Sequence, residues 1–176
     1  MSDRSSLAPP YARPVSTSLR RALCAVTVAV ALAAATGCTG GDDSGPAPPS
    51  PSGKAAGTCR SLHDRLPKRV DGQQRITLDP ASKYTAAWGD PAIEMRCGVP
   101  RPEKLSPGSE HYNPTAEAAE VNGVSWLLER RDGGYRFTTT DRAANVELSV
   151  PDDYAPEINA LPDLAKAIRA SVPKRS

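Results

Sequence analysis

Two histidines, His63 and His111, are the side chains of this 176-residue chain best suited to acid–base chemistry near neutral pH. Neither lies in a Gly-x-Ser-x-Gly nucleophile elbow or a zinc motif of paired histidines, and the sequence has no glycine-rich phosphate loop. Thr138–Thr140 offer hydroxyl groups, but threonine is favoured in strands, and the adjacent acids Asp152 and Asp153 are typical of a helix start. We therefore interpret both histidines as solvated surface residues and predict no catalytic residue, no metal ligand and no cofactor.

Four cysteines offer a second kind of chemistry, and their positions predict different fates. Cys24 lies in an apolar run that we expect to be removed, and Cys38 lies in a sequence typical of lipid attachment. Cys59 and Cys97 remain, and outside the cytoplasm we expect them to form a disulfide. A metal-binding or redox pair is the alternative, but the sequence contains no Cys-x-x-Cys motif to support it.

Charged residues of both signs fall at the outward positions of the predicted strands, and they are Glu94, Arg96, Glu129, Arg136 and Glu147. One interpretation is a solvated sheet face on which each cross-strand pair contributes ~0.2–1 kcal/mol. The other is a binding face, because guanidinium groups can contact carboxylates in a bidentate manner. Trp88 has an alternative place in the core, since the domain contains one phenylalanine. The candidate binding residues are Trp88, Arg96, Arg101, Arg136 and Arg142.

Alternating apolar residues predict the strands that position this face, at residues 75–78, 92–97, 124–129, 135–140 and 145–150. Asn122–Gly123, between two valines, is typical of a type I′ hairpin turn. Residues 103–120 show no period and predict a long loop that ends in a helical turn.

Two helical regions are expected beside these strands. Thr58 can cap a short helix that ends near Pro67 and places Cys59 on its apolar face. Pro162 is expected to divide the C-terminal region into a short helix and a longer one starting at Asp163. The apolar stripe of this C-terminal region consists of Ile158, Leu161, Leu164, Ala165, Ile168 and Val172. The sequence therefore predicts an α+β fold, with an antiparallel sheet of four to five strands and the C-terminal helix packed on one face.

Residues 1–37 predict a signal peptide with a lipobox. Four arginines and one acid precede the apolar run 22–36, which is shorter than the ~20 residues needed to span a bilayer. Ala35-Thr36-Gly37-Cys38 resembles a lipobox, with Ala35 where leucine is usual; ordinary cleavage after Ala35 is the alternative. A diacylated Cys38 would anchor the protein to the extracytoplasmic face of the cell membrane. Arg20–Arg21 leaves the general and the twin-arginine export routes open.

Residues 38–57 comprise the predicted lipidated cysteine and a Pro/Gly/Ser-rich segment without a large apolar side chain, which predicts a disordered tether. Residues 58–176 are expected to form a single globular domain. Residues 1–38 hold four of the 22 basic and one of the 20 acidic side chains, so the processed chain carries 18 basic and 19 acidic residues. This near-neutral balance argues against nucleic acid as a partner.

A set of short motifs resembles a known family. Trp88–Ile93 (Trp-Gly-Asp-Pro-Ala-Ile) and 96–102 (Arg-Cys-Gly-Val-Pro-Arg-Pro) are similar to the signature of an actinobacterial group of predicted lipoproteins, the domain of unknown function 3515 family. Further matches are Val121–Leu127, Tyr135–Arg142 and Val146–Pro151, so the resemblance covers residues 58–172. The resemblance implies a cell-envelope lipoprotein, but it implies no particular reaction, cofactor or catalytic residue.

Two classes of function follow from these patterns. We prefer a non-enzymatic, membrane-anchored module that binds an envelope protein or a wall component. The alternative is an exported enzyme, such as a hydrolase, whose site uses His63 or His111 with distant acids. A closed pocket around either histidine with a carboxylate within reach would favour the enzyme. The sequence names no ligand and indicates no oligomeric state.

Overall fold

The structure is a computed structural model, and it describes residues 45–175. The predicted signal peptide, Cys38 and the first part of the predicted tether lie outside the described residues. None of the described helices is long and apolar enough to cross a membrane.

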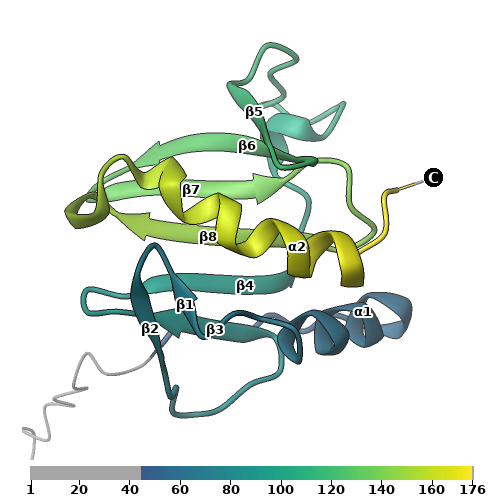
Figure 1. Ribbon diagram of the computed structural model, residues 1–176. Coiled ribbons are helices and arrows are strands. Elements are labelled where there is room, and N and C mark those ends of the chain that lie inside the picture. Colours follow the sequence, from purple (N-terminus) through teal and green to yellow (C-terminus); the bar gives the residue numbers. More distant parts are fainter. Residues whose placement is uncertain (1–44, 176) are drawn as a thin grey trace, which may run out of the picture. The chain divides into compact units, whose positions relative to one another are not determined.

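Eight strands form one sheet in the order β1-β2-β3-β4-β8-β7-β6-β5, and every neighbouring pair is antiparallel. The first four are β1 (Arg69–Val70), β2 (Gln73–Ile76), β3 (Thr85–Trp88) and β4 (Ile93–Val99). The last four are β5 (Ala118–Val121), β6 (Val124–Arg131), β7 (Gly134–Thr139) and β8 (Asn145–Pro151). Strand β8 returns to pair with β4, which joins two groups of sequential strands at the centre of the sheet (Figure 1).

The predicted α+β class is confirmed, but the prediction of four to five strands is wrong. β1 is too short to show a period, and all four residues of β3 are buried, so β3 lacks the alternation that identified the other strands. β5 lies in the segment predicted to be a loop and pairs with β6 across Asn122–Gly123. Both turn residues have positive φ, 49° and 79°, as the predicted type I′ turn requires.

Two helices pack side by side on one face of the sheet, α1 (Gly53–His63) and α2 (Leu161–Ser171) (Figure 1). Three short 3₁₀ helices, η1 (Glu103–Leu105), η2 (Asp152–Tyr154) and η3 (Glu157–Ala160), lie in the connections. Pro162 stands in the first turn of α2, where its missing N–H has no helical partner to lose. Ile158, predicted to be in the apolar stripe, is 36% exposed because it precedes α2 in η3.

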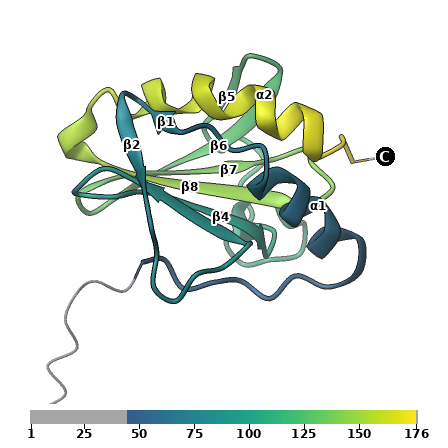
Figure 2. The ribbon, with the colours of Figure 1, turned by 60° about the horizontal axis from the view of Figure 1, so that its bottom comes forward.

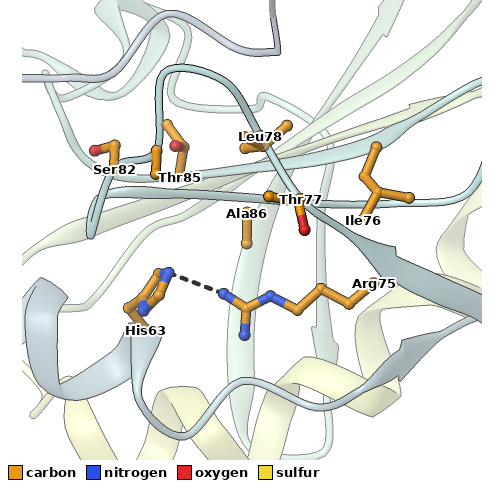
Figure 3. A pocket seen from close by; sticks show the side chains of 9 residues that line it. His63, Arg75, Ile76, Thr77, Leu78, Ser82, Thr85 and Ala86 are labelled. Atoms are coloured by element: carbon orange, nitrogen blue, oxygen red, sulfur yellow. Dashed lines mark hydrogen bonds between the residues drawn. The ribbon is translucent and has the colours of Figure 1, made fainter.

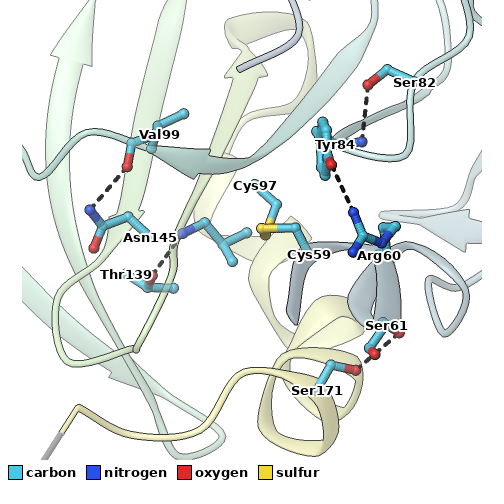
Figure 4. The surroundings of a disulfide bond; sticks show 11 residues. Cys59, Arg60, Ser61, Ser82, Tyr84, Cys97, Val99, Thr139, Asn145 and Ser171 are labelled. Carbon is cyan, nitrogen blue, oxygen red and sulfur yellow. Dashed lines mark hydrogen bonds between the residues drawn. A yellow bond between two sulfur atoms is a disulfide. The ribbon is translucent and has the colours of Figure 1, made fainter. Parts of the chain in front are cut away.

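The core lies between this helical face and the sheet. Trp88, Trp126 and Phe137 are almost completely buried there, and the Trp88 indole Nε1–H donates to the carbonyl oxygen of Pro67 at 3.1 Å. The predicted cysteine pair is confirmed: Cys59 of α1 and Cys97 of β4 are joined through sulfur atoms 2.04 Å apart (Figure 4). The bond therefore attaches α1 to the central strand.

The segment before α1 corrects the predicted boundary between tether and domain. The helix begins at Gly53, five residues before the predicted cap Thr58. Figure 2 shows the preceding residues running along the sheet before the chain enters α1. Pro51 lies so close to Gly98 that a Cβ added there would be 2.6 Å from the Pro51 Cβ atom. Residues 45–57 are thus part of the folded domain, because proline packs on the sheet even without large apolar side chains.

Candidate functional site

The five charged residues singled out from the sequence come together on the face of the sheet opposite the helices. Ile93, Met95 and Cys97 of β4 are buried, and Cys97 is bonded to α1, so the alternating Glu94 and Arg96 point to the other face.

Strand register arranges this face in two rows. Arg96 of β4 pairs with Glu147 of β8, which pairs with Thr138 of β7. Two residues further along each strand, and on the same face, a second row consists of Glu94, Ser149, Arg136 and Glu129. Glu129 and Arg136 are direct cross-strand partners, as are Arg96 and Glu147, so oppositely charged residues are neighbours across the strands.

Two glutamates form the floor of this face. The side chains of Glu129 and Glu147 are 8% and 12% exposed. The Arg96 Nε atom lies 3.3 Å from Glu147, and the Arg136 guanidinium lies 3.3 Å from Glu129 and 3.8 Å from Glu147. Arg136 therefore bridges the two carboxylates.

Two further cations, which were not among the sequence candidates, complete the cluster. Arg131 Nη2 lies 3.1 Å and Lys104 Nζ 3.4 Å from the same Glu129 oxygen. Both side chains are more than 40% exposed, so they stand at the rim above the buried carboxylate. Arg131 directly precedes the Asp132–Gly133 turn, a position that could have suggested it. Lys104 lies in a segment without a period, so the sequence offered no comparable signal.

Burial affects the carboxylates of this face. The pKa of Glu147 is raised by burial, against the opposing effect of the Arg96 guanidinium. Burial also raises the pKa of Glu94, with a smaller lowering by Arg96 and a smaller rise from Glu147. Unlike the other two glutamates, Glu94 has no cation within ion-pair distance among residues 45–175.

These side chains line two adjoining hollows, which we call the charged groove. The larger, of about 450 Å³, contains the cluster of Arg96, Glu129, Arg131, Arg136 and Glu147. Its wall is formed by residues 99–104 and His111. The smaller, of about 300 Å³, contains Glu94 and Ser149 and shares Arg131 and Arg136 with the larger. The two hollows are thus neighbours on the strand face.

Arg101 lies in the wall of the groove, as the predicted edge position required. Its Nε and Nη1 atoms donate to the carbonyl oxygens of Leu105, at 2.9 Å, and Thr140, at 3.3 Å. These bonds connect the wall segment to the end of β7, so the side chain fixes the wall as well as lining it.

Trp88 and Arg142 do not flank the face, which corrects two of the predicted site residues. Trp88 lies in β3 on the core side and is 0% exposed. Arg142 is 3% exposed, and its guanidinium donates to the carbonyl oxygens of Gly123 and Val172. A buried arginine that satisfies backbone acceptors is a structural residue and offers no donor to a ligand.

The two histidines occupy different places. His111 is exposed at the groove wall, with Nε2 3.6 Å from Glu103. His63 is not a solvated surface residue: its side chain is 18% exposed and lines a separate hollow of about 340 Å³ (Figure 3). Arg75 Nη2 lies 2.9 Å from His63 Nε2, and the pKa of His63 is lowered by burial and then by Arg75 and Lys83. The neutral imidazole thus accepts a hydrogen bond from Arg75.

The hollow around His63 also tests whether that residue could act as a general base. Asp64 Oδ1 lies 3.7 Å from His63 Nδ1. The Nε2 atom, which would take a proton from a nucleophile, is occupied by the Arg75 guanidinium. Among residues 45–175, no hydroxyl group donates a hydrogen bond to either imidazole. Within that part of the chain there is also no group of three or more ligand residues that could hold a metal ion.

Comparison with known proteins gives a family. Residues 21–176 match the family described as "Protein of unknown function (DUF3515)". Neither a curated protein nor a solved structure shows significant similarity to the chain. Because the match covers most of the sequence, including every strand and both helices, the chain belongs to this family.

Proposed function

We propose that this protein is a lipid-anchored protein of the extracytoplasmic membrane face, and that its domain binds an acidic envelope ligand through the charged groove. The anchor is supported by the signal-peptide pattern of residues 1–37 and by the lipobox-like sequence before Cys38. Binding is supported by the geometry of the groove, and the disulfide between Cys59 and Cys97 agrees with an oxidising compartment.

The observation that carries the proposal is the excess of cations around the two floor glutamates. Four cationic side chains, those of Arg96, Lys104, Arg131 and Arg136, surround the carboxylates of Glu129 and Glu147. This six-residue cluster therefore has a positive net charge, although the two hollows taken together, which also hold Arg101, Glu94, Glu103 and Asp132, are balanced.

The donors of the two central arginines are not all used. The Nε atoms of Arg96 and Arg136 are buried and face Glu147 and Glu129 at 3.3 Å, so the outer guanidinium nitrogens are the donors that a ligand can reach. Their guanidinium groups lie over the groove floor, and each side chain is 34% exposed. A ligand carboxylate can thus receive charge-assisted, bidentate hydrogen bonds from groups that the fold already holds in place.

The exported hydrolase remains the alternative class, but the site geometry favours binding over catalysis. A hydrolase built on histidine needs a nucleophile within hydrogen-bond reach of the base. The groove instead presents positively charged donors around fixed carboxylates, an arrangement that holds a ligand without activating a nucleophile.

The test is capture of envelope material by the soluble domain 45–176. Arg96→Lys with Arg136→Lys keeps both charges over the buried glutamates, so the domain stays folded, but it removes the planar fork that a bidentate contact needs. We expect this variant to capture much less cross-linked envelope material than the wild type, with a similar melting temperature. Arg65→Lys, at an exposed position just after α1, is the matched control and should change nothing.

Two outcomes would reject the proposal. Equal capture by the Arg96→Lys/Arg136→Lys variant would show that the groove is not the binding site. Loss of a hydrolytic activity in a His63→Asn variant, which leaves the groove intact, would instead support the enzyme.

A further inference from the structure

Glu94 is a strand acid of the charged groove without an ion-pair partner among residues 45–175, and Asp132 in the neighbouring turn also lacks one. Glu129 and Glu147 each contact at least two cations, whereas Glu94 contacts none within ion-pair distance among the described residues. Its side chain is only partly exposed and lines the smaller hollow beside Ser149. Its carboxylate thus remains open to the hollow, where a cationic group of a ligand can contact it.

The position of Glu94 relative to the arginines is set by strand register. Glu94 of β4 and Arg136 of β7 both pair with Ser149 of β8, so the three residues form one straight cross-strand row. With strands ~4.8 Å apart, the backbones at Glu94 and Arg136 are separated by about 10 Å. Glu94 and Arg136 therefore stand two strands apart in this row, with Ser149 between them.

The hollows at the two ends of this row are neighbours that share two lining arginines. Arg131 and Arg136 line both the cavity that contains the cation cluster and the cavity that contains Glu94. A single ligand can therefore lie along the groove, with one end at the cations and the other at Glu94.

We propose that the charged groove binds a short zwitterionic peptide, with its carboxylate at Arg136 and its free ammonium group at Glu94. An extended chain advances ~3.3–3.6 Å per residue, so about three residues span the 10 Å row. Ser149 lies midway and offers a hydroxyl to the peptide backbone. This inference rests on the proposed function and adds the chemical class, the orientation and the length of its ligand.

The experiment compares three probes by calorimetry with the soluble domain 45–176. Trialanine has both charged ends, N-acetyl-trialanine lacks the ammonium group, and trialanine amide lacks the carboxylate. We expect trialanine to bind roughly tenfold more tightly than either blocked peptide, because each block removes one charge-assisted hydrogen bond.

Two variants assign each end of the peptide to its residue. Glu94→Gln should abolish the preference for trialanine over the N-acetylated peptide while preserving its preference over the amide. Arg136→Lys should do the opposite, because it weakens the contact to the carboxylate. Glu110→Gln, which removes an exposed acid outside the groove, is the matched control and should preserve both preferences.

The outcomes separate this inference from the proposed function. If trialanine and its N-acetylated form bind the wild type equally, or Glu94→Gln keeps the preference, the zwitterionic ligand is wrong and an acidic ligand remains. If trialanine does not bind at millimolar concentration while envelope capture still depends on the arginines, the peptide class is wrong. If neither capture nor peptide binding responds to the arginine variants, the proposed function fails.

Discussion

The Nη2 atom of Arg142 donates a hydrogen bond to the carbonyl oxygen of Gly123 across 2.6 Å. The same guanidinium donates from Nη1 to Val172, so it ties the β5–β6 turn to the chain that follows α2. Arg142 is buried, whereas Arg101, the other arginine predicted at the edge of the face, is exposed. Two arginines that look alike in the sequence therefore have different roles.

Arg142→Ala is expected to lower the free energy of unfolding by ~2–4 kcal/mol, because it leaves two backbone acceptors without their donor. Arg101→Ala is the matched comparison, and it should cost less than about 1 kcal/mol because water can replace the lost donor at the surface. Urea denaturation of both variants measures the difference. If Arg142→Ala lowers the free energy of unfolding no more than Arg101→Ala does, the buried guanidinium is not structural.

Reduction of the Cys59–Cys97 bond is expected to lower the free energy of unfolding by ~2–5 kcal/mol, since the bond closes a long loop in the unfolded chain. The sequence separation of the two cysteines is 38 residues. The measurement is denaturation with and without reductant, and a Cys59→Ser/Cys97→Ser variant is the control. Reductant should have no further effect on that variant, and two free thiols in the unreduced wild type would disprove the bond.

Gly98→Ala is expected to destabilise the domain, because Gly98 has φ +89° and an added Cβ would overlap Pro51. The conformational part alone costs ~1–2 kcal/mol. Gly57→Ala, inside α1 and with no atom within 4 Å of the added Cβ, should instead stabilise by ~0.5–1 kcal/mol. Opposite shifts in melting temperature are the expected result. A harmless Gly98→Ala would argue that residues 45–52 do not pack on the sheet.

His63 is expected to titrate below its ordinary pKa of 6.5, mainly because of burial and secondarily because of Arg75 and Lys83. The unfolded chain then binds a proton at a higher pH than the folded chain. The contribution of neutral His63 to the free energy of unfolding is therefore fully present above pH 6.5. It is lost as the pH falls toward the lower pKa of the folded chain. Imidazole NMR titration measures the value, and Arg75→Gln should move it partway back. A wild-type pKa at or above 6.5 would contradict the buried, arginine-paired site.

Cys38 is expected to carry lipid in cells. Incorporation of a labelled fatty-acid analogue should be lost in Cys38→Ser and kept in Cys24→Ser, because the predicted signal peptide that contains Cys24 is removed. Label retained by Cys38→Ser would show that the anchor assignment is wrong. Release of the Cys38→Ser protein from membranes would show that lipid alone holds it there.

The local pattern of apolar, polar and turn residues was sufficient to predict much of the fold. Alternation of apolar and polar residues in the sequence revealed β4, β6, β7 and β8. Burial alternates in the same way along β4 and most of β8, whereas the last three residues of β7 are all buried. Asn122–Gly123 predicted its turn correctly, since few other residues adopt positive φ in succession. β3 was not predicted, because both of its faces are buried and its sequence therefore does not alternate between apolar and polar residues.

For the charged groove, too, the local sequence predicted one part and the tertiary structure decided the rest. Alternation along each strand placed Glu94, Arg96, Glu129, Arg136 and Glu147 on one face, because side-chain direction in a strand depends on position alone. Which strands are neighbours depends on the return of β8 to β4, a long-range pairing that local sequence does not specify. Only that topology places Glu147 between Arg96 and Arg136, adds Lys104 and Arg131 above Glu129, and withdraws Trp88 and Arg142 into the interior.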